Sequence, residues 1–127
     1  MKKVMLALVM SSVMALADST TVDATMKLMK QGMDDVQSGF LYNNKEALAK
    51  GISTLENANA IFSTVDVATF IPHNNKIQVT KNINKNLADD LKAFKKALKE
   101  QDFSAATANY GKVMNDCLSC HIIIRGW

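Results

Sequence analysis

Turn-forming residues are scarce in this chain of 127 residues, which contains one proline and five glycines. A β sandwich needs many tight turns, so their scarcity favours a helical domain. A strong charge of one sign is also missing, because 15 Lys and Arg face 12 Asp and Glu. That balance argues against a nucleic-acid-binding protein, and a hydrophobic content of 48% argues against disorder. The length predicts a single domain.

The N-terminus has the three-part layout of a secretory signal peptide. Lys2 and Lys3 precede an apolar run over residues 4–16, and Ala15, Leu16 and Ala17 form an A-x-A cleavage site. The alternative is a short membrane anchor, but this run of about 13 residues is shorter than the roughly 20 needed to cross a bilayer. We therefore predict cleavage of residues 1–17 and a mature domain over residues 18–127 that does not span a membrane.

Apolar residues recur every three or four positions along four stretches, residues 19–40, 45–63, 76–99 and 102–124. This spacing is typical of amphipathic helices. Asn43 and Asn44 suit a turn or an N-cap, and Asp102 suits an N-cap. The longest connection, residues 64–75, contains Pro72. Four such helices with mostly short links predict an all-α fold, an antiparallel four-helix bundle.

The two cysteines of the chain lie in the sequence Cys117-Leu118-Ser119-Cys120-His121. C-x-x-C-H is the attachment motif of c-type haem. Residues three and four apart share one face of a helix, so both thiols can form thioethers with one haem while His121 binds the iron. The motif predicts one covalently bound haem c on the C-terminal helix, with His121 as the proximal axial ligand.

Three other interpretations of the cysteine pair remain open at this stage. The pair could be a redox dithiol, although thioredoxin-like proteins place C-x-x-C at a helix start after a strand. It could bind zinc, although a closed site needs four ligands and His73 is the only other histidine. It could be a structural disulfide, although so short a loop stabilises little.

The position of C-x-x-C-H near the C-terminus of an exported helical chain resembles the class II c-type cytochromes, the cytochrome c′ family. The resemblance covers the mature chain in layout and is specific only around residues 117–125. It implies a four-helix bundle with the haem on the last helix, and it implies that Arg125, four residues after the haem-binding histidine, lies near the haem. The sequence departs from the gas-binding members, because Val22 stands where they carry an arginine if Met26 is the distal residue.

The sixth iron ligand is predicted to be a methionine of the first helix, which resembles the low-spin branch of that family. Met26, Met29 and Met33 share one stripe; Met26 fits the family's distal position best, Met29 is the second choice and Met33 the third. A Met/His site raises the reduction potential relative to a bis-His site. His73 follows Pro72 in a polar loop and is predicted to be solvated.

Together these features predict a non-enzymatic, monohaem electron carrier of the periplasm that exchanges electrons with redox partner proteins. No second set of catalytic groups stands out in the sequence. A five-coordinate cytochrome c′ that binds nitric oxide and a haem-free thiol oxidoreductase are the alternatives. The resemblance also makes a homodimer through the first two helices a state to test.

Overall fold

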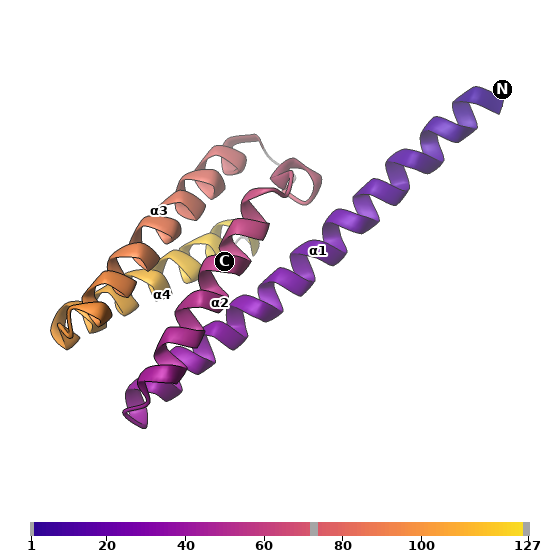
Figure 1. Ribbon diagram of the computed structural model, residues 1–127. Coiled ribbons are helices and arrows are strands. Elements are labelled where there is room, and N and C mark those ends of the chain that lie inside the picture. The colour runs from indigo at the N-terminus through magenta and orange to yellow at the C-terminus, as the bar shows by residue number, and fades with distance from the viewer. Residues whose placement is uncertain (1, 72–73, 126–127) are drawn as a thin grey trace.

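The computed structural model describes residues 2–71 and 74–125, with side chains described over residues 19–71 and 76–125. Within these ranges the chain forms four α-helices and no strand: α1 (Lys2–Leu41), α2 (Lys45–Ser63), α3 (Asn74–Lys99) and α4 (Phe103–Arg125). A short 3-10 helix, η1 (Val67–Thr69), lies between α2 and α3 (Figure 1). The predicted all-α fold of four helices is confirmed.

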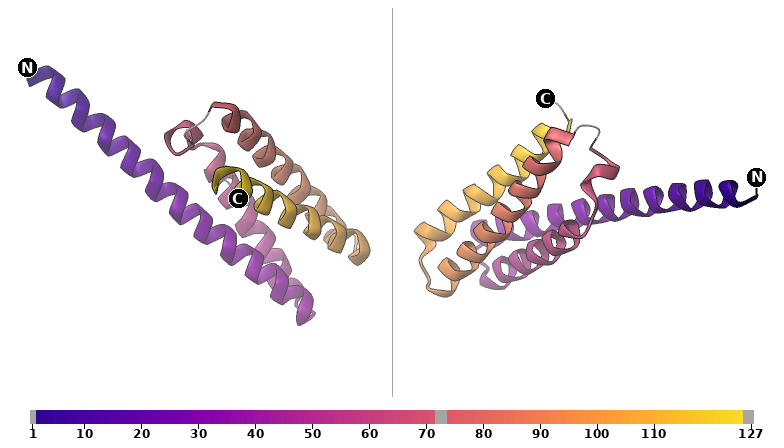
Figure 2. Two further views of the ribbon diagram at one scale, coloured as in Figure 1. Left: turned by 180° about the vertical axis from the view of Figure 1, so that it is seen from behind. Right: turned by 90° about the horizontal axis from the view of Figure 1, so that it is seen from above.

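The helices pair as two antiparallel hairpins, α1 with α2 and α3 with α4. α2 and α3 join the hairpins, as the views from behind and from above show (Figure 2). α1 includes the predicted helical segment 19–40 and extends from Lys2 to Leu41. The Met-, Leu- and Ala-rich run of residues 4–16 contains good helix formers, which accounts for the extension toward Lys2. Cleavage of residues 1–17 stays a prediction.

Two short polar residues begin helices where the sequence predicts it. Asn44 Oδ1 accepts a hydrogen bond from the backbone N–H of Ala47 at 3.0 Å and begins α2. Asp102 Oδ1 accepts one from Ala105 at 2.9 Å and begins α4. Each side chain satisfies a backbone donor that has no partner within its helix. These caps fix the turns that reverse the chain in each hairpin.

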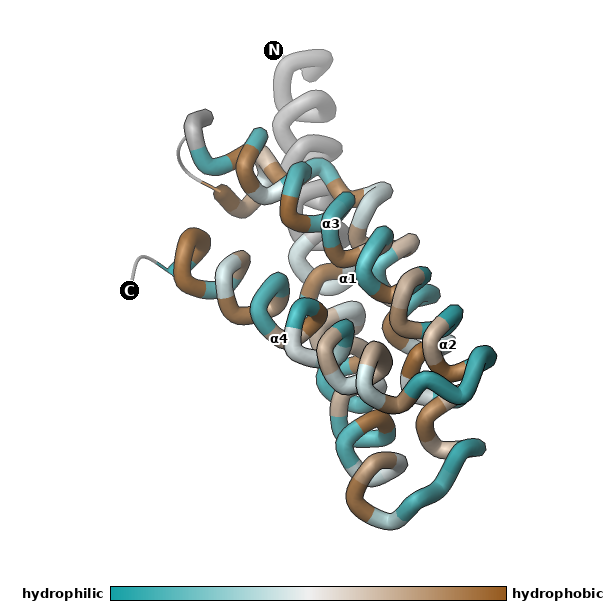
Figure 3. The backbone as a smooth tube through the Cα atoms, turned by 90° about the vertical axis from the view of Figure 1, so that its left-hand side faces the viewer, coloured by the Kyte–Doolittle hydropathy of each residue, from teal (hydrophilic) through white to brown (hydrophobic). Residues whose placement is uncertain are grey.

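The core follows the predicted stripes, and hydrophobic residues recur along each helix (Figure 3). Its largest fully buried apolar side chains are Val36, Ile52, Leu55, Leu91, Phe94 and Val113. Val67 and Ile71 from the connection between α2 and α3 are each 3% exposed. The connection therefore packs into the core and closes one end of the bundle.

An aromatic cluster of Phe40, Phe94 and Tyr110 joins α1, α3 and α4. The ring of Phe40 stacks on Phe94 with centroids 5.9 Å apart and lies 5.7 Å from that of Tyr110. Aromatic pairs at such distances contribute about 0.5–1.5 kcal/mol beyond the area they bury. Side chains thus fill the space between α1 and α4 at the end of α1 that contains Phe40.

α1 and α2 approach each other closely where glycine faces glycine. A Cβ atom on Gly51 would lie 2.7 Å from the backbone oxygen of Gly32 and 2.7 Å from Cγ2 of Val36. Such separations do not occur between real carbon side chains and their neighbours, so the helix approach depends on the missing side chain.

In the described part of the chain, no helix is both long and apolar enough to cross a membrane.

Candidate functional site

α1 and α4 diverge away from the aromatic cluster. No described Cα atom of α4 lies within 8 Å of one in α1, whereas each helix packs directly on its hairpin partner. Helices that pack directly have axes about 8–10 Å apart, and some of their Cα atoms then lie less than about 8 Å from each other. The divergence therefore leaves room between α1 and α4 for side chains and a ligand.

A pocket of about 220 Å³ lies in this divergence. Its lining residues from α1 and α4 include most of the residues that the sequence singled out: Met26, Met29, Met33, Cys117, Cys120 and His121. Apolar side chains of α2 and α3, among them Phe62 and Leu87, complete the wall. Residues about 90 positions apart in the chain thus meet at one apolar site, which sequence spacing predicted only through the helical stripes.

The three methionines differ in burial. Met29 is 9% exposed, and Met26 and Met33 are partly buried. Met114, on α4 itself, also lines the pocket. Met26 is less buried than Met29, and all three methionines of α1 line the same pocket as His121. The structure therefore does not single out Met26, and its role as distal ligand stays a prediction.

Cys117 and Cys120 are half-buried, and both thiols are free. Burial, with a smaller contribution from the carboxylate of Asp116, raises the pKa of Cys117 to about 11, and burial also raises the pKa of Cys120. Reactive redox cysteines have a lowered pKa at helix N-termini or beside cations. These two lie well inside α4 beside an acidic residue, so their surroundings suppress thiolate chemistry.

Asp116 is a pocket residue that the sequence motifs did not single out. It is 9% exposed, lines the pocket, and its Oδ2 atom has no hydrogen-bond partner among the described residues. Burial, together with the nearby carboxyl group of Asp90 on α3, raises the pKa of Asp116 to about 6. The sequence could have indicated the burial of Asp116 through its position three residues after Val113, on the apolar stripe of α4.

Replacing Asp116 with asparagine should stabilise the ligand-free chain at pH 8. The folded state holds the Asp116 proton more tightly than the unfolded state does, since the pKa rises from 3.8 to about 6. The resulting cost is fully present above pH 6 and is relieved as pH falls toward 4, so we expect the variant to gain about 1–2 kcal/mol at pH 8. Urea denaturation at several pH values measures this.

Asp89 provides the matched control on α3. It is exposed, and a hydrogen bond from Lys85 lowers its pKa. Asp89→Asn should leave the free energy of unfolding unchanged or slightly reduced. An Asp116→Asn chain less stable than the parent at pH 8 would contradict the expected cost of the buried carboxylate.

A pair of asparagines forms part of the pocket wall between α2 and α3. Nδ2 of Asn59 donates to the backbone oxygen of Asn84 at 3.2 Å, and Nδ2 of Asn84 donates to Oδ1 of Asn59. Asn59 is 4% exposed, so these bonds satisfy its buried amide. Asn59, the polar residue that interrupts the apolar stripe of residues 45–63, thus links the two hairpins.

Arg125 is exposed at the end of α4 and does not line the pocket. Its proximity to a haem stays a prediction. His73 lies outside the described residues. Across the described side chains, no group of three or more His, Cys, Asp or Glu is placed to hold a metal ion.

Comparisons with known proteins add no relative. No family model matches the chain, and neither the curated proteins nor the solved structures contain a significant match.

Proposed function

We propose that this protein is a monohaem c-type cytochrome that carries electrons, with haem c bound between α1 and α4. One observation carries the proposal: Cys117, Cys120 and His121 line a single apolar pocket together with the three methionines of α1. Covalent tethers, an imidazole and a thioether are the groups that such a site requires. Bound there, the haem iron would supply one-electron chemistry.

The polarity of the site suits an apolar group. α1 and α4 do not pack directly on each other beside the pocket, and the aromatic cluster lies between them nearer the end of α1. The walls are almost entirely carbon and sulfur, and the charged lining residues are Lys30 and Asp116. Lys30 is paired with Asp34 at 2.6 Å. An apolar wall excludes water and supports axial ligation by a soft thioether.

Each residue of the motif has a distinct task in this proposal. Cys117 and Cys120 would hold the porphyrin as thioethers, so the finished protein would need no reactive thiolate. His121 and Met26 would bind the iron through nitrogen and sulfur, with Met29 as the second choice for the sulfur, and the iron would supply one-electron chemistry. Arg125 lies near the haem in the resembling family, and we propose the same place for it here.

The proposal extends to the biological setting that the sequence predicts. A cleaved signal peptide over residues 1–17 would deliver the chain to the periplasm, where bacteria attach haem c. The protein would then exchange electrons with redox partner proteins and catalyse no reaction itself. The resemblance to the cytochrome c′ family implies a homodimer through α1 and α2 as the oligomeric state to test.

Optical spectra of the protein matured in a haem-attaching bacterium test the proposal. A low-spin spectrum with the methionine-to-iron charge-transfer band, unchanged by carbon monoxide, supports the electron carrier. A high-spin spectrum that carbon monoxide alters would instead support the gas-binding cytochrome c′. A colourless protein that reduces disulfides would support the thiol oxidoreductase, which the raised pKa values of both cysteines disfavour.

Met26→Ala should convert the low-spin spectrum to a high-spin one and open the iron to carbon monoxide. The reason is that alanine removes the thioether while leaving the other pocket residues in place. Met29→Ala and Met33→Ala are matched controls on the same stripe and should remain low-spin. If Met29→Ala alone produced the conversion, the assignment to Met26 would be wrong.

A further inference from the structure

A second pocket lies at the opposite end of the bundle, between the start of α2, the end of α3 and the start of α4. Its volume is about 320 Å³, within the range of small-ligand pockets. Leu48, Ala49, Ile52, Leu98 and Phe103 form its apolar surface. No residue that we assign to haem binding contributes to it, so a ligand in this pocket is independent of the proposed function.

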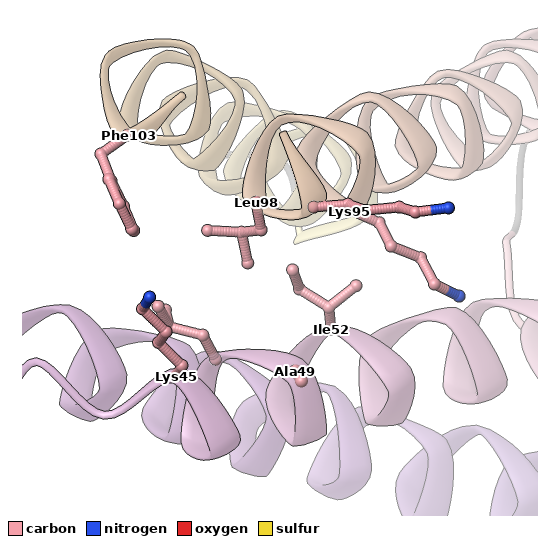
Figure 4. Close-up of a pocket in the computed structure, with 8 residues that line it drawn as sticks. Lys45, Ala49, Ile52, Lys95, Leu98 and Phe103 are labelled. Atoms are coloured by element: carbon pink, nitrogen blue, oxygen red, sulfur yellow. The ribbon is translucent and has the colours of Figure 1, made fainter. Parts of the chain in front are cut away.

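Three lysines, Lys45, Lys95 and Lys99, line the same pocket, and no acidic residue does. Figure 4 shows Leu98 pointing toward Ile52 across the pocket, with Lys45 and Phe103 at one end of the pocket and Lys95 at the other. Lys95 is paired with Glu56 at 2.8 Å. Lys45 and Lys99 form no ion pair with a described residue. Two uncompensated ammonium groups therefore border an apolar hollow.

Lys45 and Phe103 contact each other at one end of the pocket. The Lys45 ammonium lies 5.9 Å from the centre of the Phe103 ring, within cation–π range. Phe103 is 42% exposed, so part of its ring stays open to solvent. Leu48 and Ile52 beneath it are 3% and 2% exposed and belong to the core. The floor is therefore fixed by core packing, while the lysine rim is free to adjust.

The chemistry of the pocket selects its ligand. A neutral apolar molecule would leave the ammonium groups without a counter-charge, and a small polar anion would leave the apolar floor unused. A ligand that combines an apolar chain with a carboxylate meets both requirements. Its chain covers the apolar floor, and its carboxylate pairs with the lysine ammonium groups. We propose that this pocket binds an amphiphilic carboxylate, a straight-chain aliphatic monocarboxylate, through Lys45 and Lys99.

Isothermal titration of the exported, purified full chain with octanoate tests this proposal. Octanoate should bind, and acetate and 1-octanol should bind at least about tenfold more weakly, because each lacks one of the two recognised parts. The variant K45Q/K99Q should weaken octanoate binding about tenfold, the loss expected for charge-assisted hydrogen bonds. The control K81Q/K112Q removes two exposed lysines from elsewhere and should change the dissociation constant less than about twofold.

A second variant tests the location without removing charge. Ala49 is exposed and lines the pocket, so Ala49→Leu should fill the pocket and abolish octanoate binding while α2 stays helical. Ala108→Leu, at an exposed position of α4, is the matched control and should bind octanoate as the parent does. Failure of the parent to bind octanoate, or undiminished binding by either K45Q/K99Q or Ala49→Leu, would overturn the proposal.

Discussion

Alanine in place of both Cys117 and Cys120 should leave the exported protein without covalently bound haem. The chain contains no other cysteine, so no residue remains that can form a thioether bond. The loss should be complete, and it is the largest functional effect that we expect of any substitution. Intact mass spectrometry, together with haem staining after denaturing electrophoresis, measures it directly.

The control for this variant lies inside the same motif. Leu118 is 53% exposed, so Leu118→Ala removes an apolar side chain without touching the attachment groups. It should carry a full complement of haem. A double-cysteine variant that keeps its haem through denaturation, or a parent protein that never acquires one, would be incompatible with the proposed function.

Gly51→Ala should destabilise the fold by about 2 kcal/mol, although alanine is the better helix former. The new Cβ would lie 2.7 Å from the Gly32 backbone oxygen and 2.8 Å from the Val36 backbone nitrogen. Backbone atoms cannot rotate away as a flexible side chain can, so α1 and α2 must separate. Their separation loosens the packing of Val36, which is fully buried. Urea denaturation monitored by circular dichroism measures the loss.

Gly111→Ala isolates the contribution of helix propensity. Gly111 lies within α4, and a Cβ there would meet no heavy atom within 4 Å. The same substitution should therefore stabilise the protein by about 0.5–1 kcal/mol. Equal effects of the two substitutions, in either direction, would mean that the close approach of α1 and α2 contributes nothing to stability.

The sequence predicted the secondary structure well because the signals were local. The bounds of α2 agree with the predicted range 45–63, since apolar periodicity and the Asn44 cap act over a few residues. α4 begins at Phe103, directly after the predicted Asp102 cap. The C-x-x-C-H motif likewise needs five consecutive residues and nothing else. Local signals also explain why α1 extends back to Lys2, because residues 4–16 contain good helix formers.

Features that depend on packing between distant segments were not predictable. Burial of Asp116 and the approach of Asp90 depend on how α4 lies against α3. The lysine-lined pocket joins the ends of three helices that are far apart in the sequence. The methionine stripe predicted which residues share a face of α1, but only the arrangement of the two hairpins brings that face to Cys117, Cys120 and His121.

The anchored aromatic end of the bundle bears on how the cytochrome would be assembled. Phe40, Phe94 and Tyr110 tie α1 to α3 and α4 through contacts that involve no residue of the methionine–cysteine pocket. In the proposed cytochrome, the polypeptide could therefore order its helices before haem is attached. Protein packing would then meet most of the entropic cost of aligning the side chains proposed to bind the iron, and the haem would enter a site whose walls are already in place.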